Sequence, residues 1–176
     1  MNSVFQKKQW PLYYKHGFWQ IETKPYQNNG NMKMEEMNLA LEGIVLLKNQ
    51  LHGMAETDEK FAAISTALED AEADFENEFG SQMHEILLDV YDELCPDSDI
   101  MPFKNYLAKF YHVRKSNGKD SYLVDGTEGF LVQMDDFPKK ETKLVLLPCP
   151  LRIELNIDDY TKEQVWTAEK KVVYNW

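Results

Sequence analysis

The chain has 176 residues, of which 43% are hydrophobic and 12% aromatic, so it can bury a hydrophobic core and does not have the composition of a disordered chain. Its formal net charge of −11 disfavours general binding to the phosphate backbone of nucleic acids. No stretch approaches the roughly 18 consecutive apolar residues of a membrane span, and the first residues lack the apolar run of a signal peptide. We therefore expect a cytoplasmic protein that makes no membrane contact.

The start of the chain predicts a β-hairpin. Residues 10–19 read WPLYYKHGFW and place five aromatic side chains around a turn at residues 15–17. Aromatic residues favour strands and supply buried area to a neighbouring sheet or helix. We expect the hairpin to pack the start of the chain onto the rest of the fold. In the alternative interpretation, aromatic rings contact a partner through Trp10, Tyr13, Tyr14 and Trp19.

Three helices are predicted over residues 32–94. Apolar residues recur at helical spacing in each of them, and capping residues or glycines mark the ends. The expected boundaries are Asn31 to Gly53, Thr57 or Asp58 to Gly80, and Ser81 to about residue 94, with Pro96 closing the last helix.

The pattern changes to strands in the C-terminal half. Residues 151–157 alternate, with leucine and isoleucine on one face and Arg152, Glu154 and Asn156 on the other. Strands that follow helices predict an α+β fold with a mostly antiparallel sheet. We expect one domain over residues 1–176, helical to about residue 100 and β-rich from about residue 105.

The middle of the chain is strongly acidic. From Glu35 to Asp99 there are 18 acidic residues, and the only bases are Lys48 and Lys60. An ordinary solvated helix mixes charges of both signs, because like charges one turn apart repel. The acidic residues expected to contact a partner are Glu69, Asp70, Asp74, Glu76, Glu78, Glu85, Asp89, Asp92 and Glu93.

This charge pattern favours a non-enzymatic function in protein–protein interaction. A small inhibitor, immunity-like protein or adaptor that presents acidic helices to a basic protein partner would have this distribution. The alternative within the same pattern is that the acids are the solvated face of helices whose other face is buried.

Two other classes of function remain open. One is a ligand-binding domain or an enzyme, with an aromatic-lined pocket between sheet and helices. The other is a homo-oligomer in which the basic flanks of one copy contact the acidic middle of another. Light scattering at several salt concentrations would separate this last class from binding to a different protein.

The sequence contains no recognisable catalytic or metal-binding motif, so we expect no catalytic residue, no metal and no cofactor. Cys95 lies at a predicted helix end among acidic residues, which makes it a packed and unreactive thiol. Cys149 lies between two prolines, and the sequence leaves open whether the two cysteines meet. The four histidines are scattered without metal-ligand spacing.

Overall fold

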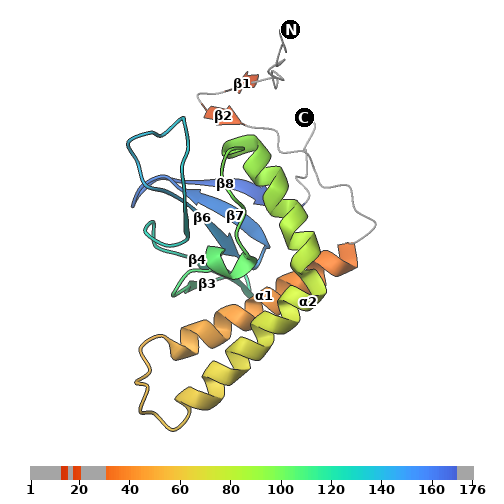
Figure 1. Ribbon diagram of the computed structural model, residues 1–176, viewed down its shortest axis with the longest axis vertical. Helices are drawn as coiled ribbons and strands as arrows, with labels where there is room; N and C mark the ends of the chain where they lie inside the picture. The colour runs from red at the N-terminus through yellow and green to blue at the C-terminus, as the bar shows by residue number, and fades with distance from the viewer. Residues whose placement is uncertain (1–12, 16–17, 21–30, 170–176) are drawn as a thin grey trace.

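The computed structural model describes residues 13–15, 18–20 and 31–169, with side chains from residue 33 onward. It has an α+β architecture in which two long helices precede antiparallel strands (Figure 1). The elements of residues 31–169 are α1 (Asn31–Leu51), α2 (Phe61–Leu94), the 3₁₀ helix η1 (Phe103–Tyr106), β3 (His112–Ser116), β4 (Lys119–Leu123), β5 (Phe130–Val132), β6 (Thr142–Leu147), β7 (Arg152–Asn156) and β8 (Lys162–Thr167).

The helical region contains two helices, so the prediction of three is wrong. The first expected helix is present as α1, but the second and third form the continuous helix α2. The predicted stop at Gly80 and cap at Ser81 lie inside α2, and Figure 1 shows that α2 bends in its middle. A Gly–Ser pair bends a helix without ending it, because backbone hydrogen bonding continues on either side. The apolar spacing also continues across the pair, from Phe79 to Met83.

The predicted N-terminal hairpin is also corrected. β1 (Tyr13–Lys15) and β2 (Phe18–Gln20) pair only with each other and extend neither of the sheets of the C-terminal half. Aromatic residues give this stretch strand propensity, but an isolated pair of short strands is only marginally stable in water. The prediction of an N-terminal hairpin as an element of the α+β fold is therefore wrong, and Trp10 and the turn residues 16–17 lie outside the described residues.

The strands pair antiparallel as expected, but they form two sheets instead of one. β3 and β4 make a two-stranded sheet, and β5 to β8 make a four-stranded sheet in sequential order. The division follows from the packing of β6, whose two faces are both buried. Leu144 and Leu146 belong to one core, whereas Val145 and Leu147 pack with Tyr122 of β4 in the other. The β3–β4 sheet thus lies against a face of β6 rather than along its edge.

The helices and the four-stranded sheet share the larger core. It joins residues of α1, α2, η1 and the strands β6 and β7, with Phe75 and Phe79 of α2 among its largest side chains. The first part of α2 runs beside α1, and its second part turns back toward the sheet (Figure 1). This arrangement leaves one side of α1 facing the β3–β4 sheet, where the candidate site is formed.

Candidate functional site

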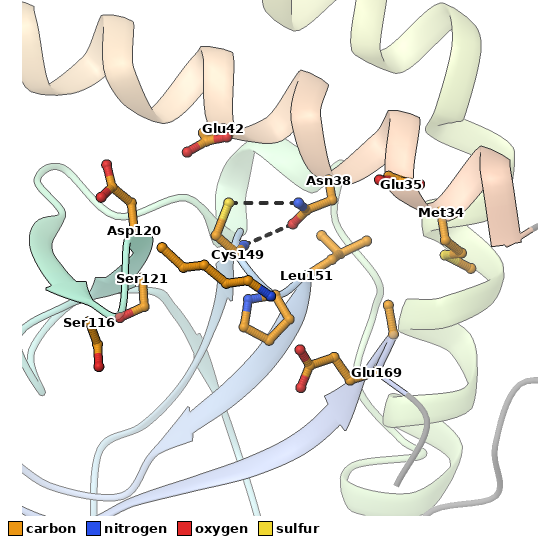
Figure 2. Close-up of a pocket in the computed structure, with 13 residues that line it drawn as sticks. Met34, Glu35, Asn38, Glu42, Ser116, Asp120, Ser121, Cys149, Leu151 and Glu169 are labelled. Atoms are coloured by element: carbon orange, nitrogen blue, oxygen red, sulfur yellow. Dashed lines mark hydrogen bonds between the residues drawn. The ribbon is translucent and has the colours of Figure 1, made fainter. Parts of the chain in front are cut away.

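A groove of about 780 Å³ lies between α1 and the strands (Figure 2). Its walls come from the first turns of α1, the β3–β4 sheet, the turn between β6 and β7, and residues 168–169 after β8. Four segments that are far apart in sequence therefore meet at one surface feature. The described residues that line it include no aromatic side chain, so it does not match the expected aromatic-lined pocket.

Cys149 forms the floor of the groove and is held by Asn38 of α1. The backbone N–H of Cys149 donates to Asn38 Oδ1 at 2.8 Å, and Asn38 Nδ2 donates to the Cys149 sulfur at 3.6 Å. Cys149 has a φ of 54°, a left-handed conformation that is costly for a residue other than glycine. The bonds to Asn38 help to fix the turn between β6 and β7 in this conformation.

Glu42 lies one turn after Asn38 and accepts a hydrogen bond from the Tyr122 hydroxyl at 2.9 Å. Burial, together with smaller effects of the Glu42 and Asp120 carboxylates, raises the pKa of the Cys149 thiol to about 11, against the lowering effect of the Asn38 bond. Burial and the bond to Glu42 likewise raise the pKa of Tyr122 well above its usual range. Cys149 is therefore a neutral thiol near pH 7, which is unsuited to nucleophilic catalysis.

The groove carries an excess of negative charge. Glu35 and Glu42 contribute carboxylates from α1, Asp120 from β4 and Glu169 from the segment after β8, and Lys119 is the only base in the described lining. In Figure 2, Glu42 and Asp120 lie near Cys149, whereas Glu35 and Glu169 lie toward the other end, with Leu151 between. Separated carboxylates with an apolar centre suit a ligand that carries several cationic groups joined by apolar atoms.

Arg152 is a buried residue that fixes the back of the groove. Its guanidinium donates to Glu154 Oε1 at 2.7 Å, to the Tyr122 carbonyl at 2.6 Å and to the carbonyls of Pro148 and Pro150, each at 3.2 Å. Arg152 thereby ties the turn that carries Cys149 to strand β4. The sequence places Arg152 on a polar strand face, but β3–β4 covers that face, and Asn156 is buried there as well. The sequence pattern did not indicate that Arg152 would be buried or that it would connect the turn between β6 and β7 to β4.

The nine acidic residues predicted to contact a partner are all exposed on α2. Among the described residues, the ion pairs join His112 to Asp125, Lys140 to Asp158 and Arg152 to Glu154. Asp74 and Glu78 of α2 take part in none of these three ion pairs. None of the nine lines the groove, so the structure contains two separate acidic surfaces.

The other predicted residues have different outcomes. Cys95 is buried at the end of α2, as expected for a packed helix end, and burial raises its pKa. Cys95 and Cys149 are both free thiols and belong to different hydrophobic clusters. Tyr13, Tyr14 and Trp19 lie in β1 and β2, where no side chain is described, so their expected role in contacts stays a prediction.

Comparisons with known proteins add no function. Protein-family models, curated proteins and solved structures gave no match to this chain. Within residues 31–169, no helix is both long and apolar enough to cross a membrane. The described residues also contain no group of three or more histidine, cysteine or acidic side chains placed to hold a metal ion.

Alkylation of Cys149 should be slow at pH 7 and should accelerate up to about pH 11. The reason is that only the thiolate reacts, and burial together with the nearby carboxylates keeps the thiol protonated. Replacement of Asp120 by asparagine removes one of these carboxylates and should move the pH–rate profile to lower pH. The measurement is iodoacetamide modification followed by mass spectrometry in a Cys95→Ala background. A profile centred near pH 7 would contradict this description of the groove floor.

Proposed function

We propose that this protein is a non-enzymatic interaction protein, of the inhibitor, immunity-like or adaptor type, that presents the acidic face of α2 to a basic protein partner. The observation that carries the proposal is the exposure of all nine predicted acidic residues on a single helix. Acidic residues spread over a folded surface need no partner to explain them. Their concentration on one helix, without a lysine or arginine between Phe61 and Leu94, does call for an explanation.

Spacing on each half of α2 supports the proposal. Asp70, Asp74 and Glu78 lie four residues apart on the first half. Asp89 and Asp92 lie three residues apart on the second half. Side chains three or four residues apart project from the same side of a helix, so each half presents its own row of carboxylates.

These rows destabilise the isolated protein and favour a complex with a cation-rich surface. Each like-charged pair one turn apart costs about 0.2–0.5 kcal/mol in a helix. A basic partner relieves this repulsion, and its electrostatic attraction also accelerates encounter at low ionic strength. The proposal therefore predicts that affinity for the partner falls as the salt concentration rises.

A second candidate function rests on the groove. Its volume of about 780 Å³ is that of a small-ligand site, and it lies between α1 and the strands as a ligand-binding domain would require. The Cys149 thiol in this groove is neutral near pH 7 and is therefore not activated as a nucleophile. For this second candidate we propose binding of a small ligand, without a catalytic step.

The proposed function is tested by neutralising the acidic rows of α2. A variant with Asp70, Asp74, Asp89 and Asp92 changed to asparagine and Glu78 changed to glutamine removes five negative charges. A matched control neutralises five exposed acids elsewhere, namely Glu56, Asp135, Asp136, Glu141 and Glu163. Both variants and the original chain are used for affinity capture from lysate of the native host at low and high salt, and captured proteins are identified by mass spectrometry.

We expect the original chain and the control to capture the same basic protein at low salt, and we expect high salt or the α2 variant to abolish capture. The α2 variant should also be more stable than the original chain by about 1 kcal/mol, because like-charged pairs are removed. Equal loss of capture in the α2 variant and the control would reduce the effect to net charge and contradict a specific role for α2. Unchanged capture by the α2 variant would exclude the proposal.

A further inference from the structure

Helix α1 carries a row in which acidic residues alternate with exposed leucines. Glu35, Leu39, Glu42 and Leu46 lie at positions i, i+4, i+7 and i+11, so they follow one line along the helix. Leu39 is 59% exposed and Leu46 is 45% exposed. We call these four residues the α1 row. The buried side chains of α1, such as Leu41, project from another side of the helix.

The α1 row borders the acidic groove. Glu35 and Glu42 belong to both, because they line the groove from α1. The Tyr122 hydroxyl holds the Glu42 carboxylate in place at 2.9 Å, so this charge is positioned before any ligand arrives. Asp120 and Glu169 provide further carboxylates on the opposite walls. The row and the groove thus form one surface with fixed negative charge beside exposed leucines.

This surface selects among occupants by its chemistry. A small polyamine would satisfy the carboxylates but would leave Leu39 and Leu46 in water. A second copy of the chain would have only its mildly basic flanks to offer, and its net charge of −11 would oppose its approach to the same carboxylates. A basic protein segment with apolar side chains between its cations complements both features.

We propose that the α1 row and the adjoining groove bind a segment of a partner protein in which lysine or arginine residues flank apolar side chains. The apolar side chains cover Leu39 and Leu46, and the cations reach Glu35, Glu42 and Asp120. This site does not involve the acidic rows of α2. The proposal therefore goes beyond the proposed function and can be tested independently of it.

The probe for this site is a synthetic peptide of alternating lysine and leucine, Lys-Leu-Lys-Lys-Leu-Lys, blocked at both ends. Companion probes are the same peptide with serine in place of leucine, the same peptide with glutamate in place of lysine, and spermidine. Binding to the ¹⁵N-labelled full chain is followed by two-dimensional NMR, which reports the amides that shift. Affinity is measured in parallel by isothermal titration calorimetry.

Three variants locate the site. One replaces Leu39 and Leu46 by serine, and another changes Glu35→Gln together with Asp120→Asn. The matched control is Leu88→Ser, because Leu88 is a 44% exposed leucine on α2. Circular dichroism establishes that each variant is folded before its affinity is compared with that of the original chain.

We expect the lysine–leucine peptide to shift the amides of Asn38, Glu42 and Ser121 and to bind more tightly than every companion probe. Each of the two α1 or groove variants should weaken it by about 5- to 10-fold, through lost apolar contact in the first and lost charge attraction in the second. Leu88→Ser should leave the affinity unchanged. The five-acid α2 variant should also retain peptide binding, which separates this proposal from the proposed function.

Four results would overturn the proposal. They are an absence of binding, shifts confined to α2, equal binding of the serine peptide or spermidine, and a concentration-dependent dimer that buries the α1 row. The first two would show that the site is not used by basic segments. Equal binding of the companion probes would reduce the interaction to net charge, and a dimer would assign Leu39 and Leu46 to self-association.

Discussion

Replacement of Arg152 by methionine is expected to lower the free energy of unfolding by about 3–5 kcal/mol. Methionine retains the apolar stem but removes every donor of the guanidinium. The carbonyls of Tyr122, Pro148 and Pro150 lose their Arg152 donor, and Glu154 keeps a carboxylate whose side chain is only 14% exposed. Such a charge without a partner is costly in the interior of a protein. Urea unfolding followed by tryptophan fluorescence and circular dichroism measures the loss.

The matched control for Arg152 is Arg114→Met on β3, where the side chain is exposed. We expect this variant to change stability by less than about 0.5 kcal/mol. The additional change Glu154→Leu in the Arg152→Met chain should restore part of the loss, because it removes the unpaired carboxylate. An Arg152→Met chain that is as stable as Arg114→Met would show that Arg152 does not hold the turn and β4 in place.

Replacement of Gly129 by alanine should cost about 2–4 kcal/mol for two reasons that add. Gly129 has a φ of 110°, a backbone conformation that residues with a Cβ avoid. A Cβ at this position would also lie 2.5 Å from the carbonyl oxygen of Leu144. Because this neighbour is backbone in a central strand, β6 or the start of β5 has to move. Thermal and urea unfolding of the variant provide the measurement.

Gly118→Ala is the control that separates the two reasons. Gly118 in the β3–β4 turn also has a positive φ, 75°, but a Cβ there would meet no atom within 4 Å. We expect this variant to lose only about 1–2 kcal/mol, from the unfavourable backbone conformation. Equal losses for the two alanine variants would show that the close approach between Gly129 and Leu144 does not contribute.

Periodicity in the sequence predicted the α+β class, but it gave the wrong number of helices and did not show that the strands of the C-terminal half form two sheets. The first helix and the antiparallel strands follow from apolar spacing that the structure bears out. The prediction that one helix ends at Gly80 and another begins at Ser81 was wrong. The dipeptide Gly–Ser can end a helix or bend it, and only the packing of the helix decides between these outcomes. The prediction of an N-terminal hairpin as part of the fold was wrong because strand propensity does not determine whether a strand pair joins a larger sheet.

The candidate groove was not predictable from the sequence. Asn38, Glu42, Tyr122 and Cys149 come from three elements, and each has an ordinary role when considered alone. Their meeting depends on how β3–β4 lies across β6, which is a long-range property of the fold. By contrast, the exposure of the α2 acids followed from local pattern alone, since the apolar residues of α2 fix which sides face solvent. The α1 row can be identified in the sequence once it is known that α1 buries the side that carries Met37 and Leu41, because the row then lies on the other side of the helix.

Tyr122 belongs to the surface site and to the interior at the same time. Its hydroxyl donates to Glu42 in the groove, and its carbonyl accepts from the buried Arg152. The position of the Glu42 carboxylate is therefore conditional on β4 being seated against the turn before β7. Any ligand that engages Glu42 in this position binds the seated form in preference to a form in which β4 has separated. Occupancy of the groove and cohesion of the two sheets are thus thermodynamically linked, and each strengthens the other.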